Sequence, residues 1–252
     1  MISPMDLVEA LERNASGRAL ALAAAVPGFE PHVEGDVTWF TSASDSGIFN
    51  QVHLARFEGG AVAGRVQDLL AALRSRGRPF AWWVGPRAPA GLSAELERQG
   101  LALARSLPGM ALDLARLRKP RPRPGVTVEE VTGEGGLREW EEAFSALDGA
   151  SNVLRGESLK PFRLFLGRVD GRPAGVGVLF RHADVAGVYT IVTQEAMRGR
   201  GVGTAVTAAV AGAGREAGDR FAVLTATEMG HPLYVRMGFE DVCEVFVYRV
   251  GP

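Results

Sequence analysis

The chain is poor in cysteine, with Cys243 as the single one among 252 residues. One cysteine cannot form an intrachain disulfide or a cysteine-rich metal site, which suits a reducing compartment. No apolar run approaches the ~20 residues that span a bilayer. The first twenty residues lack the basic region and apolar core of a signal peptide. We therefore expect a cytoplasmic protein without a membrane segment.

An excess of charge of either sign is also missing. The sequence carries 28 basic and 29 acidic residues, so net charge gives no drive toward nucleic acid or membrane. The histidines show no metal-ligand spacing, and we expect no metal site; they are His32, His53, His182 and His231. The length fits one large or two small domains.

One segment is rich in proline and arginine. Residues 117–125 read LRKPRPRPG, and prolines at every second position favour an extended conformation. The sequence predicts a linker at 120–125 that separates a domain at 1–119 from a domain at 126–252. An exposed loop within one domain is the alternative interpretation.

The C-terminal half has the pattern of a mixed α/β domain. Alternating or β-branched apolar segments predict strands at 126–131, 162–169, 174–180, 185–193, 221–227 and 242–250. Amphipathic segments predict helices at 137–147, from the glycine turn to about 217, and at 232–237.

The N-terminal half repeats the end of this order. We expect helices at 65–76 and 91–99 and strands at 80–84 and 110–117. RSRGRPFAWWV aligns with REAGDRFAVLT, and LERQGL aligns with YVRMGF, at an offset of about 140 residues. This similarity favours duplication; chance agreement of short patterns is the alternative.

The stretch MRGRGVGTAV, residues 197–206, combines glycines and arginines between a strand and a helix. Free N–H groups at a helix N-terminus bind anions, glycine permits close approach, and Arg198 and Arg200 add charge. The turn therefore predicts a phosphate or pyrophosphate ligand, with a ligand-free tight connection as the alternative.

The spacing of this turn excludes two common phosphate motifs. No Gly-Lys pair occurs, which excludes a Walker A loop, and Thr204 and Val206 stand where a dinucleotide fingerprint needs glycine or alanine. The pattern that fits is R-x-x-G-x-G at Arg198, Gly201 and Gly203.

TQEAMRGRGVGTAVTAAV resembles the acetyl-CoA loop of the GNAT superfamily of N-acetyltransferases, and PLYVRMGFE resembles that superfamily's second signature. The resemblance covers roughly residues 124–252. It implies that backbone groups of Ile191, Val192 and Thr193 bind pantetheine. It further implies Tyr234 as the general acid that protonates the leaving thiolate. The pyrophosphate would contact the amides of Arg198, Gly199, Arg200, Gly201, Val202, Gly203 and Thr204.

Two positions depart from the family pattern. Glu195 stands where proline is frequent, which loosens the exit of the strand. Thr227 stands where many members have asparagine, and its shorter side chain puts the corresponding cofactor contact in doubt.

The resemblance implies acetyl transfer from acetyl-CoA, without a metal, to a primary amine by direct attack. A small-molecule acceptor is favoured; a protein N-acetyltransferase and a CoA-binding sensor or scaffold without turnover remain alternatives. Candidate general bases are Asp184, Glu228 and Glu142, with a water chain as the alternative. Cys243 is expected to be a small buried residue rather than a nucleophile. Acceptor specificity is expected in the loop 147–161.

The N-terminal half lacks both chemical elements of the site. Glu58 brings negative charge to the position of the phosphate turn, and Leu96 aligns with Tyr234. The fold class expected is thus α/β, with two tandem GNAT-like domains, each a mixed, mostly antiparallel sheet flanked by helices. The N-terminal domain would be a degenerate copy that completes the core, forms a homodimer or walls the acceptor pocket. Asn50 is expected to be a satisfied strand residue, with a bridge between domains as the alternative.

Overall fold

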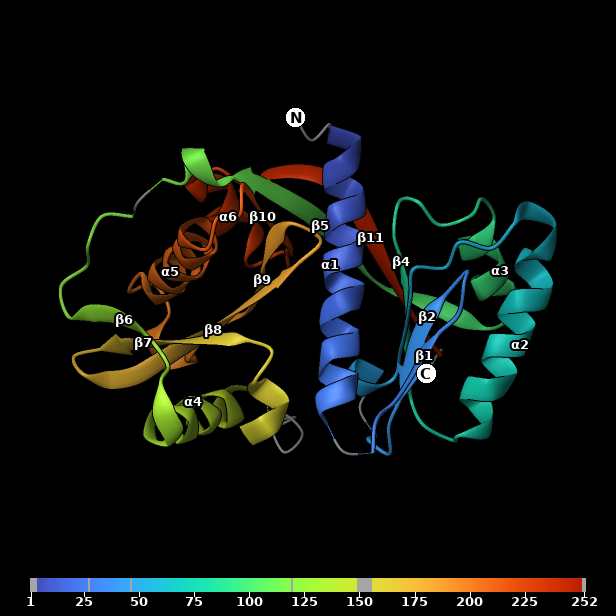
Figure 1. Ribbon diagram of the computed structural model, residues 1–252, viewed down its shortest axis with the longest axis horizontal. Coiled ribbons are helices and arrows are strands. Elements are labelled where there is room, and N and C mark those ends of the chain that lie inside the picture. The colour runs from blue at the N-terminus through green and yellow to red at the C-terminus, as the bar shows by residue number, and fades with distance from the viewer. Residues whose placement is uncertain (1–3, 27, 46, 119, 149–155, 251–252) are drawn as a thin grey trace. The chain divides into compact units, whose positions relative to one another are not determined.

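A computed structural model describes residues 4–26, 28–45, 47–118, 120–148 and 156–250 (Figure 1). The chain forms two compact units, which are considered separately. Unit 1 comprises Met1–Gly109 and Val242–Pro252, and unit 2 comprises Met110–Asp241.

Unit 1 is a mixed sheet with the strand order β1-β2-β3-β4-β11-β5. The pairs β1–β2, β2–β3 and β4–β11 are antiparallel, and β3–β4 is parallel. Its strands are β1 Glu30–Val33, β2 Thr38–Thr41, β3 Gln51–His53, β4 Ala81–Val84 and parts of β5 Leu101–Asp113 and β11 Glu240–Val250. Its helices are α1 Pro4–Ala25, α2 Val62–Ser75 and α3 Leu92–Arg98.

The two faces of the unit 1 sheet bury different residues, because successive strand side chains point to opposite faces. Trp82 of β4 and Val52 of β3 belong to the core that includes the apolar stripe of α2. Phe40 of β2 packs instead with Ala19 and Ala23 of α1. Helices therefore cover both faces of this sheet.

In unit 2 the strand order of the mixed sheet is β5-β10-β9-β8-β7-β6. The pairs β6–β7, β7–β8 and β8–β9 are antiparallel, and β9–β10 is parallel. Its strands are the end of β5, β6 Val126–Glu130, β7 Arg163–Val169, β8 Arg172–His182, β9 Val185–Thr193 and β10 Phe221–Thr225. Its helices are α4 Gly133–Asp148, α5 Val202–Glu216 and α6 His231–Met237.

Helices α4 and α5 cover opposite faces of the unit 2 sheet (Figure 1). Phe165 of β7 packs in the core with α5. Its neighbours Leu164 and Leu166 pack in a separate core with Trp140 of α4. Both turns that join the antiparallel strands beside α5 use left-handed backbone: Asp170–Gly171, as its Asp-Gly sequence predicts, and Ala183–Asp184.

Strand glycines bring α5 unusually close to the sheet. A Cβ atom on Gly167 would lie 2.7 Å from a methyl group of Val206, and one on Gly175 would lie 2.9 Å from a methyl group of Val202. Gly177 is in similarly close contact with Val206. Glycine is thus required on these strands for the helix to pack, and the packing fixes where α5 begins.

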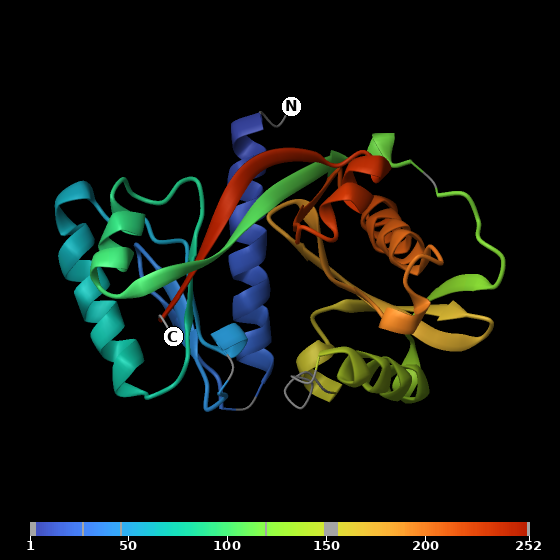
Figure 2. The same cartoon turned by 180° about the vertical axis from the view of Figure 1, so that it is seen from behind.

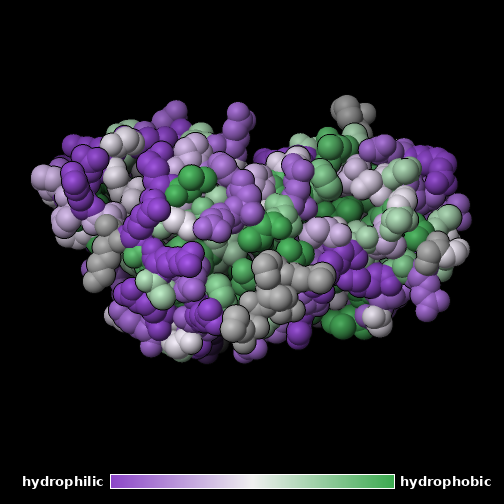
Figure 3. All heavy atoms as spheres, turned by 90° about the horizontal axis from the view of Figure 1, so that it is seen from above, coloured by the Kyte–Doolittle hydropathy of each residue, from purple (hydrophilic) through white to green (hydrophobic). Residues whose placement is uncertain are grey.

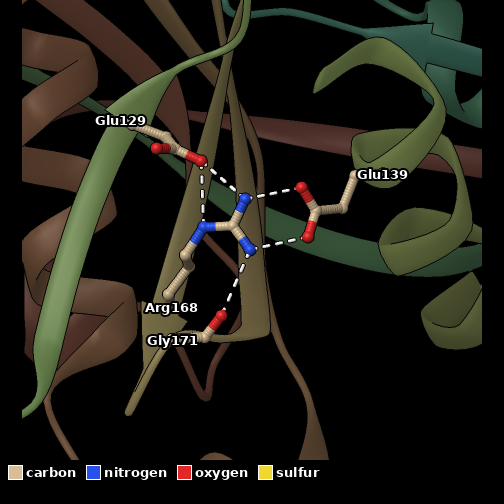
Figure 4. A network of polar contacts seen from close by, with 4 residues as sticks. All are labelled: Glu129, Glu139, Arg168 and Gly171. Carbon is tan, nitrogen blue, oxygen red and sulfur yellow. Dashed lines mark hydrogen bonds and ion pairs between the residues drawn. The ribbon is translucent and has the colours of Figure 1, made fainter. Parts of the chain in front are cut away.

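Arg168 of β7 forms hydrogen bonds that link α4 and β6 to the β7–β8 hairpin (Figure 4). Its guanidinium donates to Glu129 at 2.6 and 2.9 Å, to Glu139 at 2.6 Å on both oxygens, and to the carbonyl oxygen of Gly171 at 3.3 Å. The hydrogen bond from Arg168 holds the pKa of Glu139 below its usual range. Bidentate geometry of this kind is the strong form of an Arg–carboxylate pair.

Two strands, β5 and β11, cross the boundary between the two units in the sequence. Residues 246–249 of β11 pair with β4 of unit 1 in the register Phe246↔Val84 to Arg249↔Ala81. Strand β5 begins in unit 1 and ends in unit 2. Just after β5, the N–H of Leu114 donates to the carbonyl oxygen of Arg220 at 2.9 Å. Figure 2 shows β5 and β11 side by side. Residues 120–125, expected to separate the domains, lie within unit 2.

The fold class expected from the sequence is confirmed: an α/β protein with mixed, mostly antiparallel strand pairing flanked by helices. The strand expected at 110–117 in fact runs from Leu101 to Asp113, and α1 was not anticipated. Within the described ranges, no helix is long and apolar enough to cross a membrane. Hydrophilic side chains cover much of the face seen from above, with smaller hydrophobic patches between them (Figure 3).

Candidate active site

The parallel strands β9 and β10 are paired over only part of their length. Their register joins Val185 with Phe221, Ala186 with Ala222 and Gly187 with Val223. Both strands continue beyond it, to Thr193 and Thr225, while β9 remains paired with β8 as far as Thr193. The edge of β9 that faces β10 is therefore available near Ile191, Val192 and Thr193, which are all partly exposed.

A bulge in β9 accompanies this divergence. The β8–β9 register shifts between Val176, opposite Val192, and Val178, opposite Tyr189. Thr190 lies inside the shift with φ of 52°. A positive φ is unfavourable for a β-branched residue, and bulges bend the strand that carries them. The bulge therefore redirects the end of β9 just before the glycine turn.

The glycine turn leads directly from β9 into α5. Gly199 has φ of 75°, and Gly201, with φ of 90°, is the N-cap of α5 and has no side-chain cap. The N–H of Ala205 donates to the carbonyl oxygen of Gly201 at 3.0 Å and is the first amide of α5 with an acceptor inside the helix. The preceding amides, of Val202, Gly203 and Thr204, have no acceptor within a helix, as at any helix N-terminus. This arrangement suits an anion.

Two arginines of the turn are exposed beside these amides. Nη1 of Arg198 lies 3.7 Å from a carboxylate oxygen of Glu195, and both side chains are well exposed. Nη1 of Arg200 lies 3.6 Å from the sulfur of Met197. Exposed pairs of this geometry contribute little, so both guanidinium groups remain available for a ligand.

Gly203 marks the place where three elements of unit 2 meet. A Cβ atom on Gly203 would lie 3.4 Å from the hydroxyl oxygen of Thr193 on β9 and 3.4 Å from a methyl group of Leu233 on α6. The structure thus brings together the end of the diverging strand, the glycine turn and the helix of Tyr234. The sequence signals no contact role for Leu233.

Tyr234 is buried in α6, with 9% of its surface exposed. Its ring packs edge-on against Phe239, with 5.8 Å between centroids. Burial raises the pKa of Tyr234 to about 12, so the phenol is protonated at neutral pH. Its hydroxyl forms no hydrogen bond with any residue that the structure describes.

Thr227, the departure from the family's second signature, has a local partner. Its hydroxyl accepts from the N–H of Gly230 at 3.2 Å, and its carbonyl oxygen accepts from His231 at 2.9 Å. The side chain therefore stabilises the turn into α6.

The three carboxylates expected as candidate general bases differ in how near they lie to the glycine turn and Tyr234. Asp184 occupies the β8–β9 turn at the start of β9, roughly 30 Å along the strand from the glycine turn at ~3.3 Å per residue. Glu142 is exposed on α4, and Glu228 is exposed on the segment between β10 and α6. Glu228 is thus the member of the three that lies on a segment next to Tyr234. Most of the loop 147–161, residues 149–155, lies outside the described residues.

Cys243 belongs to unit 1, and its sulfur is in close contact with Gly109. Burial and the nearby Glu12 raise the pKa of its thiol to about 11. The thiol is therefore protonated at neutral pH and is not an activated nucleophile. The described residues hold no cluster of histidine, cysteine and carboxylate side chains suited to a metal ion.

The aligned positions in unit 1 repeat the backbone but not the chemistry. Gly77 and Gly100 have φ of 62° and 85°, and their counterparts Gly218 and Gly238 have 93° and 100°. Leu96 of α3 is fully buried, and Glu58 is exposed just before the 3-10 turn Gly59–Ala61 and α2. Asn50 is satisfied locally: it accepts from the N–H of Ser42 at 2.6 Å and donates to the carbonyl oxygen of Ser44 at 3.1 Å.

A family model matches most of unit 2. Residues 130–239 match the model of the acetyltransferase (GNAT) family. A GCN5-related N-acetyltransferase from Kribbella flavida is 18% identical and has a TM-score of 0.76, with 96% of each chain covered. A GCN5-related N-acetyltransferase from Sphaerobacter thermophilus is 16% identical with a TM-score of 0.68, covering 99% of this chain and 94% of that one.

A tandem GNAT protein from the clavulanic acid biosynthesis pathway has the same fold, at 16% identity and a TM-score of 0.63, covering 99% of this chain and 95% of that one. No curated protein matches the sequence. At these identities the structural likeness concerns the fold of the whole chain.

Proposed function

We propose that unit 2, whose residues 130–239 match the model of the acetyltransferase (GNAT) family, transfers an acetyl group from acetyl-CoA to a primary amine, with a small molecule as the favoured acceptor. The observation that carries this proposal is the meeting of β9, the glycine turn and α6 around Gly203. These elements supply, within one region, a free strand edge, free helix amides and a protonated phenol.

Acetyl-CoA would lie along these elements in order. The partly exposed backbone of Ile191, Val192 and Thr193 can hydrogen-bond the amides of the pantetheine arm. The pyrophosphate would accept hydrogen bonds from the α5 N-terminus and the two exposed arginines, within residues 198–204. Helix amides and guanidinium groups both favour negative charge, which supports a phosphate-bearing ligand.

The chemistry that this arrangement supports is direct transfer. The amine nitrogen attacks the thioester carbon, and the tetrahedral intermediate collapses with cleavage of the carbon–sulfur bond. Tyr234 then gives its proton to the departing thiolate, and the ammonium proton leaves to water or to a base such as Glu228. The acetyl-CoA site supplies the thioester and holds its carbonyl in place. The phenol is protonated at neutral pH, as the acid step requires, and the burial that raises its pKa to about 12 makes it a weaker acid than a free tyrosine.

Unit 1 is, in this proposal, a second GNAT-like copy that binds no acetyl-CoA. The left-handed glycines at matching positions and the parallel β3–β4 pair, like β9–β10, support duplication. Glu58 and Leu96 replace the groups that binding and proton transfer need. The copy completes the fold, and it can also mediate a homodimer or wall the acceptor site. We place the protein in the cytoplasm on its single cysteine.

A screen of primary amines with acetyl-CoA tests the proposal. Free thiol is measured together with the mass of each amine, and acetyl-CoA binding is measured separately by calorimetry. We expect thiol release that is stoichiometric with a mass gain of one acetyl group. Tight binding without turnover on any amine or protein lysine would favour a CoA-binding sensor, and absence of binding would contradict the proposal altogether.

A further inference from the structure

Arg123 lies directly on the glycine turn of unit 2. A Cβ atom on Gly201 would lie 2.9 Å from Cγ of Arg123 and 3.7 Å from its Nε. The aliphatic part of the arginine therefore covers the Cα of the residue that caps α5. The Nε of its guanidinium therefore lies near the N-cap residue of that helix.

The fold of unit 2 fixes this position. The N–H of Val126 donates to the carbonyl oxygen of Arg123 at 3.1 Å, which closes a turn before β6. The N–H of Asp170, in the β7–β8 hairpin, donates to Gly125 at 2.8 Å, and Gly125 takes φ of 74°. The proline- and arginine-rich segment is thus tied to the sheet just after Arg123.

The charge of Arg123 has no partner among the described residues, and its side chain is exposed. Arg118, in the same segment, differs because it donates to the carbonyl oxygen of Arg236 at 3.3 Å. Arg121 is also exposed, and it is not among the atoms nearest to Gly201. Arg123 is therefore the arginine of residues 120–125 that the structure places against the glycine turn.

We propose that Arg123 is a third guanidinium of the acetyl-CoA site and donates charge-assisted hydrogen bonds to the pyrophosphate. The inference rests on the proposed function and extends it to a residue outside the glycine turn. Since Arg123 packs on Gly201 rather than on the strand, it acts on the phosphate end of the cofactor. In this proposal, residues 120–125 contribute to ligand binding as well as connecting β5 to β6.

Calorimetry on two matched variants tests this role. Arg123→Gln and Arg121→Gln remove the same charge from neighbouring positions, and each is titrated with acetyl-CoA and with 3′-dephospho-acetyl-CoA at one ionic strength. We expect Arg123→Gln to raise Kd at least tenfold for both ligands, ~1.4 kcal/mol. Arg121→Gln should change Kd less than twofold, and Arg123→Lys should recover part of the affinity.

Each other outcome decides against the assignment. Equal increases in Kd for Arg123→Gln and Arg121→Gln would mean that only the overall positive charge matters. A loss of affinity for acetyl-CoA but not for 3′-dephospho-acetyl-CoA would mean that Arg123 contacts the 3′-phosphate instead of the pyrophosphate. Melting temperatures equal to that of the parent exclude a folding defect. A parent chain that binds neither ligand contradicts the proposed function itself and the inference with it.

Discussion

Gly177 on β8 and Val206 on α5 are so close that a Cβ atom on the glycine would overlap a methyl group of the valine. Ile191 and Val210 lie 3.0 Å from the same position. Because interiors are close-packed, such a site cannot accept a methyl group without movement of the helix. The strand glycine therefore determines how near the N-terminus of α5 lies to the end of β9.

Gly177→Ala should destabilise unit 2 and weaken acetyl-CoA binding together. We expect a loss of ~1–3 kcal/mol in the free energy of unfolding, the usual cost of overpacking. Gly212→Ala is the matched control, since a Cβ there meets nothing within 4 Å and Gly212 lies within α5. That variant should gain ~0.5–1 kcal/mol. Urea unfolding and calorimetry give both quantities, and a neutral Gly177→Ala would refute the packing argument.

Tyr234→Phe should lower kcat by ~10²-fold or more, the range for a positioned acid, and change the Kd of acetyl-CoA much less. The phenylalanine keeps the packing against Phe239, so stability should change little. Tyr248→Phe, which removes a hydroxyl within unit 1, is the control and should keep the parent kcat.

The pH profile gives an independent check on Tyr234. A general acid acts in its protonated form, and burial raises the pKa of Tyr234 to about 12. Its contribution is therefore retained as pH rises and is lost only near that pKa. We expect no fall in kcat from this group between pH 8 and ~10. An unchanged kcat in Tyr234→Phe would leave proton transfer to water or another residue.

Each chain should bind one acetyl-CoA, because the R-x-x-G-x-G turn occurs in unit 2 and Glu58 stands at the aligned position in unit 1. Calorimetry should give a stoichiometry near one, and Arg198→Glu should abolish most of that signal. Glu58→Gln should leave the stoichiometry unchanged, since Arg56, three residues before Gly59, is already paired with Glu12 at 2.6 Å. Two sites per chain would contradict a degenerate first unit.

The sequence predicted features that depend on neighbouring residues. The glycine turn, the Asp170–Gly171 hairpin and β9 were all predicted because glycine positions and apolar alternation act locally. Strand β5 was predicted too short because Pro108 and Gly109 usually end strands. The pairing of β11 with β4 and the contact of Arg123 with Gly201 join segments more than 70 residues apart, and no local pattern encodes them.

The burial of His53 should make unit 1 sensitive to acid. Nε2 of His53 lies 2.7 Å from the side-chain oxygen of Gln51, and its ring stacks with Phe40 and Trp83. Burial, with the nearby charge of Arg18, lowers the pKa of His53 to about 3. The folded histidine therefore stays neutral at pH values where the unfolded one, with a pKa near ~6.5, takes up a proton.

Stability contributed by this neutral histidine is present above pH ~6.5 and is lost progressively as pH falls toward the folded pKa. Between pH 7.5 and 5.5 the expected loss is ~1.4 kcal/mol in the free energy of unfolding. His53→Gln should remove this part of the pH dependence, whereas His182→Gln, at an exposed position, should retain it. Urea unfolding followed by tryptophan fluorescence at the two pH values measures the difference. An equal pH dependence in the parent and in His53→Gln would mean that His53 is already protonated in the folded protein at pH 5.5.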